Sequence, residues 1–232
     1  MPDIAIIEHC ANDDPAYLGT WLEAEGLSYR VYRMYAGETL PADLAAYRGL
    51  AVLGGPMSAN DALPYYPQLF GLIREAVDAA KPVIGHCLGG QLLSRALGGT
   101  VQASEQVEIG WSDLAVEGVG AEWFGGADRL RPFQWHGESF SIPPGAARIA
   151  TGPYCANQAF VLDGRHLGMQ FHCEVDETKV RRWLIAGHDE LIRSASPAVQ
   201  QAEAILPTLA ETLVQSQATA AAIYRRWAQG LG

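Results

Sequence analysis

Short apolar runs alternate with segments of helical periodicity over the first 100 residues. The apolar runs predict strands at residues 4–8, 29–34, 49–53 and 82–85, and the periodic segments predict helices at 17–25, 67–80 and 88–97. Strands that are apolar along nearly their whole length, with helices between them, are typical of a parallel sheet buried on both faces. We therefore expect an α/β fold, with a mostly parallel sheet and helices on both of its faces.

From residue 101 to about residue 167 the pattern changes to short alternating stretches separated by glycine and proline. These stretches predict antiparallel strands at 107–111, 114–116, 148–151, 159–162 and 166–170, followed by a helix at 176–186. They indicate a small antiparallel appendage on the parallel sheet.

The last forty residues, rich in Ala, Gln and Leu, predict C-terminal helices. Ser196 and Pro197 have the residue types of an N-cap and a first helical position, and Pro207 predicts a kink or a break. An apolar stripe at helical spacing consists of Leu206, Leu209, Leu213, Ala220, Ile223 and Trp227. Because the polar face is not rich in Lys or Arg, we expect docking on the same domain or on a second subunit of a homodimer, rather than on a membrane.

The net negative charge of the chain excludes some classes of binding partner. The 232 residues carry 16 Lys and Arg against 26 Asp and Glu, a net charge of −10, which argues against nucleic acid and anionic lipid. No apolar run approaches the ~18 residues of a membrane helix, and the N-terminus lacks the regions of a signal peptide. The sequence thus predicts a soluble, cytoplasmic protein with four free thiols. Since no CxxC, P-loop, GxGxxG or HExxH motif is present, we expect no metal and no cofactor.

The strongest candidate for chemistry is Cys87, in the segment GHCLGGQ at residues 85–91. The segment follows a predicted apolar strand and opens a predicted helix, as in a G-x-nucleophile-x-G elbow. The N–H groups and the dipole at the start of a helix stabilise a thiolate at that position. The alternative is a small buried cysteine at a tight turn between strand and helix.

A thiol nucleophile needs a base and a group that orients the base. His172 and Glu174 follow a predicted strand and project to the same side of an extended chain, because they are two residues apart. A Gly-Gly turn at residues 54–55 can present a bare N–H to the oxyanion of acyl transfer, and Leu88, directly after the thiol, offers a second. Taken alone, His172 could instead be a structural residue that only forms hydrogen bonds. Gly54 and Gly55 alone could form an ordinary turn.

In this order and spacing, four motifs resemble those of the class I (triad) glutamine amidotransferase family, especially stand-alone members akin to the amidotransferase domain of GMP synthetase. They lie at residues 54–58, 85–91, 135–140 and 170–174, within a resemblance that runs from residue 4 to about residue 174. The family has a flavodoxin-like fold, a mostly parallel sheet covered on both faces. The resemblance implies such a domain over residues 1–194, with residues 195–232 as a helical extension.

The resemblance also implies how the central residues act. Cys87 would attack the side-chain amide carbon of glutamine and form a γ-glutamyl thioester. His172 would pass a proton to the departing ammonia, and Glu174 would orient the imidazole. The N–H groups of Gly55 and Leu88 would hold the oxyanion.

Two more segments would bind the α-amino-acid end of the substrate. Gln91 lies one helical turn beyond the thiol, and Trp135, His136, Gly137 and Glu138 match a family segment that grips the same end. Glutamate at position 138 replaces the usual aspartate, which keeps the charge but lengthens the reach of the side chain.

A second departure is Cys173, which stands where the family has a proline between the triad histidine and glutamate. These 232 residues also contain no pyrophosphate loop of a synthetase. The resemblance therefore supports glutaminase chemistry and leaves the ammonia acceptor open, either on a synthetase partner or as a separate acceptor. A direct hydrolase of γ-glutamyl amides or peptides and a catalytically idle binding module are the alternatives.

The dipeptide His-Cys occurs at residues 9–10, 86–87 and 172–173, each time at the end of a predicted strand. Thiols and imidazoles gathered at one sheet edge could bind a soft metal or form a redox pair. No ligand spacing supports a metal, so we favour ordinary packing.

Overall fold

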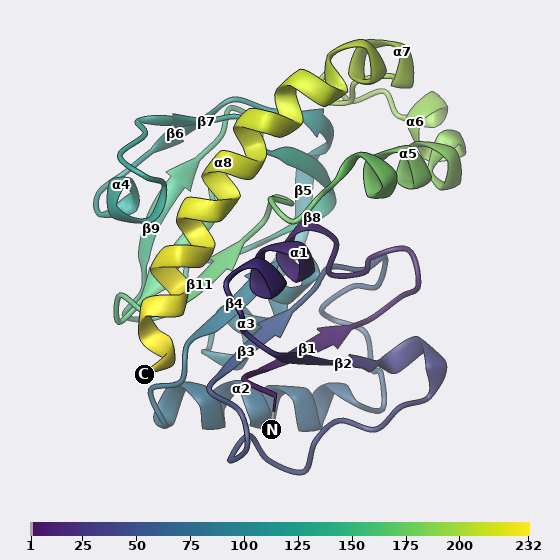
Figure 1. The fold of residues 1–232 in the computed structure, drawn as a ribbon. Coiled ribbons are helices and arrows are strands. Elements are labelled where there is room, and N and C mark those ends of the chain that lie inside the picture. Colours follow the sequence, from purple (N-terminus) through teal and green to yellow (C-terminus); the bar gives the residue numbers. More distant parts are fainter. Residues whose placement is uncertain (1) are drawn as a thin grey trace.

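A nine-stranded mixed sheet organises the computed structural model, which describes residues 2–232 (Figure 1). The strands of one half pair in parallel: β1 (Ile4–Glu8), β2 (Tyr29–Arg33), β3 (Gly49–Val52), β4 (Val83–His86) and β11 (His166–Met169). Those of the other half pair antiparallel: β6 (Leu114–Val116), β7 (Arg129–Leu130), β9 (Ala147–Thr151) and β10 (Ala159–Leu162). The strand order is β2-β1-β3-β4-β11-β10-β9-β6-β7.

The expected mostly parallel sheet with helices on both faces and an antiparallel part is confirmed, with two differences. The antiparallel strands extend the parallel sheet instead of standing apart from it. A separate two-stranded antiparallel sheet joins β5 (Val101–Trp111) to β8 (Phe133–Phe140). The sequence analysis did not predict β8, because its mixed sequence of aromatic, polar and glycine residues lacks the β-branched residues that mark a strand.

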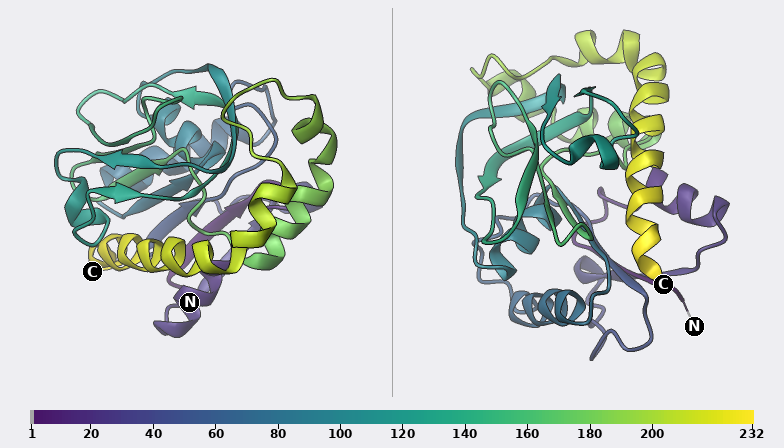
Figure 2. Two further views of the ribbon diagram at one scale, coloured as in Figure 1. Left: turned by 90° about the horizontal axis from the view of Figure 1, so that it is seen from above. Right: turned by 90° about the vertical axis from the view of Figure 1, so that its left-hand side faces the viewer.

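Two pairs of helices cover the parallel half, one pair on each face (Figures 1 and 2). Alternation along β1 separates the two cores: Ile4 and Ile6 pack with α1 and α8, whereas Ala5 and Ile7 pack with α2 and α3. The helices are α1 (Tyr17–Ala24), α2 (Tyr66–Asp78), α3 (Leu88–Ala96), α4 (Gly120–Trp123), α5 (Glu177–Ala186), α6 (His188–Arg193), α7 (Ala202–Ile205) and α8 (Leu209–Ala228), with short 3₁₀ turns at Met34–Ala36, Leu206–Thr208 and Gln229–Leu231.

The C-terminal segment differs from the sequence expectation at its start. Ser196 and Pro197 do not begin a helix, which was predicted there; α7 begins at Ala202. The chain before it instead pairs with β5: Ile109 N–H donates to the Ala198 carbonyl at 3.1 Å, and Gln200 N–H donates back to Ile109 at 2.9 Å. Backbone pairing with β5 thus overrides the local helix-start signal.

The expected break at Pro207 is confirmed, since a 3₁₀ turn separates α7 from α8. Beyond the break, α8 lies against the sheet of its own chain, between α1 and α4 (Figure 1). The predicted apolar stripe is buried except for Leu206, which is exposed in the turn. Within residues 2–232, the structure contains no helix with the length and apolar character needed to span a bilayer.

Candidate active site

Cys87 occupies the sharp turn between β4 and α3. Its backbone φ is +49°, a left-handed value that a residue with a Cβ seldom adopts. Its N–H donates to the Met169 carbonyl at 2.9 Å, which ties the turn to the end of β11. A Cβ at Gly89 would collide with the Val52 carbonyl, and one at Gly90 with that of Met169. The glycines after the thiol therefore allow α3 to begin directly against the two neighbouring strands.

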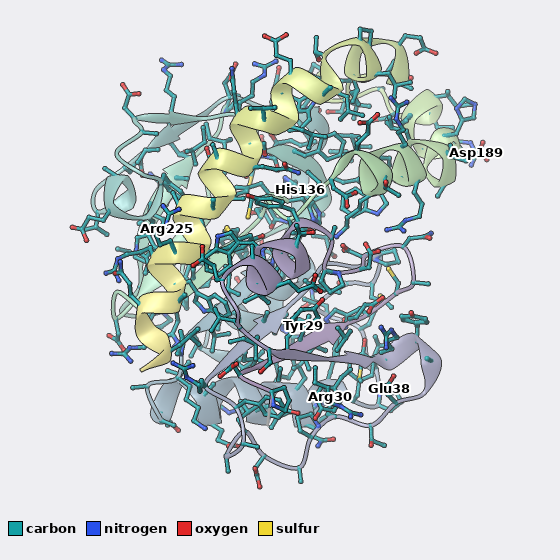
Figure 3. All side chains as sticks on the ribbon, viewed as in Figure 1. Tyr29, Arg30, Glu38, His136, Asp189 and Arg225 are labelled. Carbon is teal, nitrogen blue, oxygen red and sulfur yellow. The ribbon has the colours of Figure 1, made fainter. Side chains whose placement is uncertain are left out.

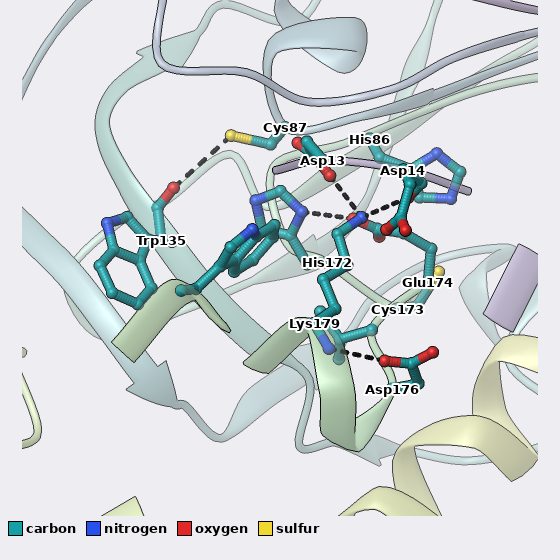
Figure 4. Close-up of polar contacts among 12 residues, drawn as sticks. Asp13, Asp14, His86, Cys87, Trp135, His172, Cys173, Glu174, Asp176 and Lys179 are labelled. Carbon is teal, nitrogen blue, oxygen red and sulfur yellow. Dashed lines mark hydrogen bonds and ion pairs between the residues drawn. The ribbon is translucent and has the colours of Figure 1, made fainter. Parts of the chain in front are cut away.

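The thiol faces a cavity of about 640 Å³ at the ends of the parallel strands. Cys87 is 6% exposed, and its Sγ lies 3.7 Å from the Trp135 carbonyl oxygen (Figure 4). The amide of Gln170 approaches the sulfur at 3.6 Å from below the cavity floor. The elbow thus presents a nearly buried thiol to one cavity.

His172 lies beside Cys87, on the loop that continues β11. Its N–H donates to the Phe133 carbonyl at 2.8 Å, and its Nδ1 lies 2.6 Å from Glu174 Oε1 (Figure 4). Burial lowers the pKa of His172, but the Glu174 carboxylate and the neighbouring thiol outweigh it and hold that pKa well above its ordinary value. The imidazole is therefore held in one orientation and favours its protonated form.

Glu174 is fully buried and carries the counter-charge for two cations. Burial raises its pKa, but His172 and Lys179 outweigh burial and hold that pKa well below its ordinary value. Lys179 Nζ lies 3.2 Å from Glu174 Oε1, forms an ion pair with Asp13 and donates to the Asp14 carbonyl at 2.7 Å. Burial of the ammonium is outweighed by these carboxylates, so the pKa of Lys179 is raised.

The sequence analysis missed Lys179 and Asp13. Lysine on an amphipathic helix is usually exposed, and α5 gave no sign that Lys179, 1% exposed, points inward. Asp13 carried a weak signal, because it follows β1 and so ends at the same sheet edge as the thiol.

Of the two expected oxyanion donors, Gly55 lines the cavity and Leu88 directly follows the thiol that faces it. The space beside the Gly55 Cα is closed by the side chains of Leu88, His9 and Met57. Among residues 2–232, the Gly55 N–H has no hydrogen-bond acceptor. Leu88 is the first residue of α3, where a helix N–H has no partner within the helix.

The five residues expected to bind the α-amino-acid end all line the cavity. Gln91 Nε2 donates to the Glu138 carbonyl at 3.1 Å, and Ser58 Oγ lies 2.9 Å from both Glu138 carboxylate oxygens. Trp135 and Gly137 are part of the same cavity wall.

His136 also lines the cavity, but most of its side chain is buried. It is 5% exposed and lies inside the molecule (Figure 3), where its Nε2 is 3.2 Å from Glu108 Oε2 and its Nδ1 is 3.1 Å from the Glu138 carbonyl. Its contacts hold β8 to β5 and the Glu138 backbone in place.

Trp183 and Glu190 complete the cavity wall and were not anticipated. Trp183, on α5, meets the His172 ring edge-to-face with centroids 4.7 Å apart, and Glu190, on α6, accepts from Trp135 Nε1 at 2.9 Å. Trp183 lies on a predicted helix whose pattern gave no signal for it, and Glu190 lies on α6, which the sequence analysis did not predict.

Comparison with known proteins gives a family match over most of the chain. The model of the family described as "Glutamine amidotransferase class-I" matches residues 20–187. The glutamine amidotransferase-like protein YfeJ of Salmonella typhimurium is 33% identical over 169 residues, which cover 68% of this chain and 70% of YfeJ. A GMP synthase (glutamine-hydrolyzing) of Xanthomonas oryzae is 34% identical over 155 residues, 62% of this chain but only 29% of that protein.

Solved structures extend the likeness to the whole fold. A glutamine amidotransferase from Methylobacillus flagellatus superposes with a TM-score of 0.96 at 43% identity, over 100% of this chain and 95% of that one. One from Thermotoga maritima gives a TM-score of 0.85 at 29% identity, over 97% and 98% of the two chains. With the family model covering most of its length, this chain belongs to the class I glutamine amidotransferase family.

Proposed function

We propose that this chain hydrolyses the side-chain amide of glutamine through a γ-glutamyl thioester on Cys87. The observation that carries the proposal is the alignment of three groups. A thiol on a left-handed elbow faces the cavity, and His172 lies beside it with Nδ1 held 2.6 Å from the buried Glu174. A nucleophile, a base and a group that orients the base are the three parts that a catalytic triad requires.

In the first half-reaction, His172 holds the proton of the Cys87 thiol, and the sulfur attacks the amide carbon as the thiolate. The carbonyl electron pair moves onto oxygen, where the N–H groups of Gly55 and Leu88 stabilise the charge. When the carbonyl re-forms, the C–N bond breaks and the His172 proton leaves with the ammonia. In the second half-reaction, His172 activates a water that attacks the thioester, which releases glutamate and restores the thiol.

Lys179 and Asp13 act through Glu174 as positioning residues. A carboxylate with no exposed surface stays ionised only when cations compensate the loss of water, and the Lys179 ammonium supplies one of them. Asp13 and the Asp14 carbonyl in turn hold the ammonium. The orientation of His172 therefore depends on a chain of charges that runs back to α5.

The α-amino-acid end of glutamine binds toward Glu138 and Gln91. Glu138 faces no cation among residues 2–232, and its carboxylate is held only by the Ser58 hydroxyl. It is therefore free to pair with the substrate ammonium. The Gln91 amide, which already contacts the Glu138 carbonyl, fixes the position of this carboxylate.

The ammonia passes to a separate acceptor or to a synthetase partner. The GMP synthase relatives support a partner. The match with this chain covers only 29% of the length of such a relative, so most of that protein has no counterpart here. The acceptor chemistry of those proteins would then lie outside these 232 residues.

The test is trapping with a diazoketone analogue of glutamine, read by peptide mass spectrometry, beside a glutaminase assay. We expect the label on Cys87, loss of hydrolysis by about 10³-fold or more in Cys87→Ala and His172→Ala, and partial activity in Glu174→Gln. Cys10 lines the same cavity, half-buried, so Cys10→Ala is the matched control and keeps its activity. Turnover at the wild-type rate in Cys87→Ala would refute the proposal.

A further inference from the structure

The cavity is larger than glutamine requires and has two ends. At about 640 Å³ it falls in the range that holds drug-sized ligands. One end is closed by Glu138 and Ser58, which we assign above to the amino-acid part of the substrate. The other end lies between the loop after β1 and helices α5 and α6, where its walls are Asn12, Trp135, Trp183, Gly187 and Glu190.

The direction of proton transfer determines which part of the substrate lies in the second end of the cavity. The nitrogen of the broken amide takes its proton from His172, so any group carried by that nitrogen lies on the His172 side of the thiol. The neighbour of His172 on that side is Trp183, 4.7 Å away between ring centroids. Ammonia leaves this end empty, whereas a substituted amine would occupy it. The second end is thus an amine compartment.

The amine compartment has aromatic walls and an uncompensated negative charge. Trp135 and Trp183 meet edge-to-face with centroids 5.9 Å apart. Glu190 accepts from the Trp135 indole through Oε2, and no Lys, Arg or His in the described part of the chain lies within ion-pair distance of it. Asp13, the other carboxylate on this side, is neutralised by Lys179. Indole rings and a free carboxylate are the groups that hold an organic cation. One face of Trp183 already carries the Lys179 ammonium, 5.1 Å from the ring centroid, so Trp135 and Glu190 are the groups left for a ligand cation.

Gly187 shows that this arrangement depends on the local backbone. A Cβ at position 187 would collide with the six-membered ring of Trp135. The absence of a side chain there lets the indole lie against the junction of α5 and α6, within reach of Glu190.

We propose that the amine compartment binds the amine portion of γ-glutamyl amides whose amine carries a second, positively charged group, such as short diamines. The inference rests on the proposed function: the same thioester forms on Cys87, and the C–N bond breaks as His172 protonates the leaving diamine. The amide of a diamine is then a better substrate than the amide of an amine with a neutral or negative end.

Three γ-glutamyl amides of equal chain length test the compartment: those of butylamine, 1,4-diaminobutane and 4-aminobutanoate, with methyl, ammonium and carboxylate ends. We expect kcat/KM to fall in the order ammonium, methyl, carboxylate, with about fivefold to thirtyfold between ammonium and methyl. Glu190→Gln should bring the ammonium-to-methyl ratio close to one.

The matched control is the neighbouring carboxylate on the same helix. Asp189 points away from the molecule (Figure 3), pairs with Arg193 at 2.9 Å and does not line the cavity, so Asp189→Asn should keep the wild-type ratio. Calorimetry with the Cys87→Ala variant adds a readout without turnover: the diamine amide should bind, and Glu190→Gln on that background should weaken binding to the level of the butylamide.

The outcomes separate the two proposals. Hydrolysis of glutamine with no hydrolysis of the three amides, a preference for the carboxylate end, or a ratio unmoved by Glu190→Gln would overturn the amine compartment and leave the proposed function standing. Failure of the wild-type protein to hydrolyse glutamine or to label at Cys87 would overturn the proposed function. Binding of the diamine amide by Cys87→Ala would even then support the compartment.

Discussion

The ends of β4 and β11 carry the same dipeptide and use it in opposite ways. At the end of β4, Cys87 faces the cavity, whereas His86 is buried and its Nε2 lies 3.2 Å from the Tyr224 hydroxyl. At the end of β11, His172 faces the cavity and Cys173 points the other way, with its thiol 3.5 Å from the same hydroxyl. In each pair one side chain faces the site and the other packs in the core under α8.

The surroundings of each side chain, rather than its residue type, determine whether it is charged or neutral. On the core side, burial lowers the pKa of His86 to about 4 and raises the pKa of Cys173, so both stay neutral at physiological pH. On the cavity side, burial is opposed by charges, and the pKa of His172 lies well above its ordinary value. Glu174 raises the pKa of both imidazoles, but it outweighs burial only at His172, whose Nδ1 lies 2.6 Å from the Glu174 carboxylate.

Lys179→Met should have the largest effect on the cavity side, because it removes the ammonium that faces Glu174. The variant leaves Glu174 and Asp13 buried without their ammonium, which should cost about 3–5 kcal/mol of unfolding free energy, measured by urea denaturation. The pKa of Glu174 should rise, and the acid limb of the kcat/KM profile should therefore move to higher pH. Activity at neutral pH should fall about tenfold to hundredfold, because an unheld Glu174 no longer fixes His172.

Lys179→Met should also change how stability depends on pH. In the wild type Glu174 has a lowered pKa, so its stabilisation is present above its ordinary pKa of 4.5 and lost as pH falls through the folded value. The stability gap between the two proteins should therefore narrow below about pH 4.5. Lys81→Met is the control, since the Lys81 ammonium contacts a backbone carbonyl and no carboxylate. An unshifted pH profile in Lys179→Met would show that Lys179 is only a packing residue.

The sequence predicts the strands and the reactive groups at their ends, but not the buried charges of Lys179 and Asp13 that support those groups. The parallel strands are predictable because nearly continuous apolar runs carry their own signal, and the thiol elbow is predictable because glycine is required beside it. Lys179 and Trp183 act from helix α5, whose pattern alone did not reveal which of its polar positions face the site. The Ser196-Pro197 signal failed because a distant strand, β5, pairs with that segment.

Gly54→Ala, on the cavity side, should have a smaller overall effect than Lys179→Met, with a loss of activity but little loss of stability. A Cβ at position 54 would lie 2.9 Å from His172 Cε1 and would collide with the Asp13 carboxylate. One side chain must move, so kcat/KM should fall by about tenfold to hundredfold while far-UV circular dichroism stays unchanged. Gly71→Ala, in the middle of α2 with no atom within 4 Å of the added carbon, should instead stabilise the protein by about 0.5–1 kcal/mol. Equal activity in the two variants would contradict the placement of the 54–55 turn against the triad.

The smallest effect should come from the core side, through Tyr224→Phe. The hydroxyl of Tyr224 contacts both neutral members of the dipeptides, His86 and Cys173, and touches nothing in the cavity. Its removal should cost about 1 kcal/mol of unfolding free energy, the usual value of one hydrogen bond, as measured in urea. Activity should stay within twofold of the wild type, because α8 keeps its packing through the unchanged ring. A tenfold loss of kcat at unchanged stability would mean that the hydroxyl reaches the triad through His86, and that the two sides of these strands are coupled rather than separate.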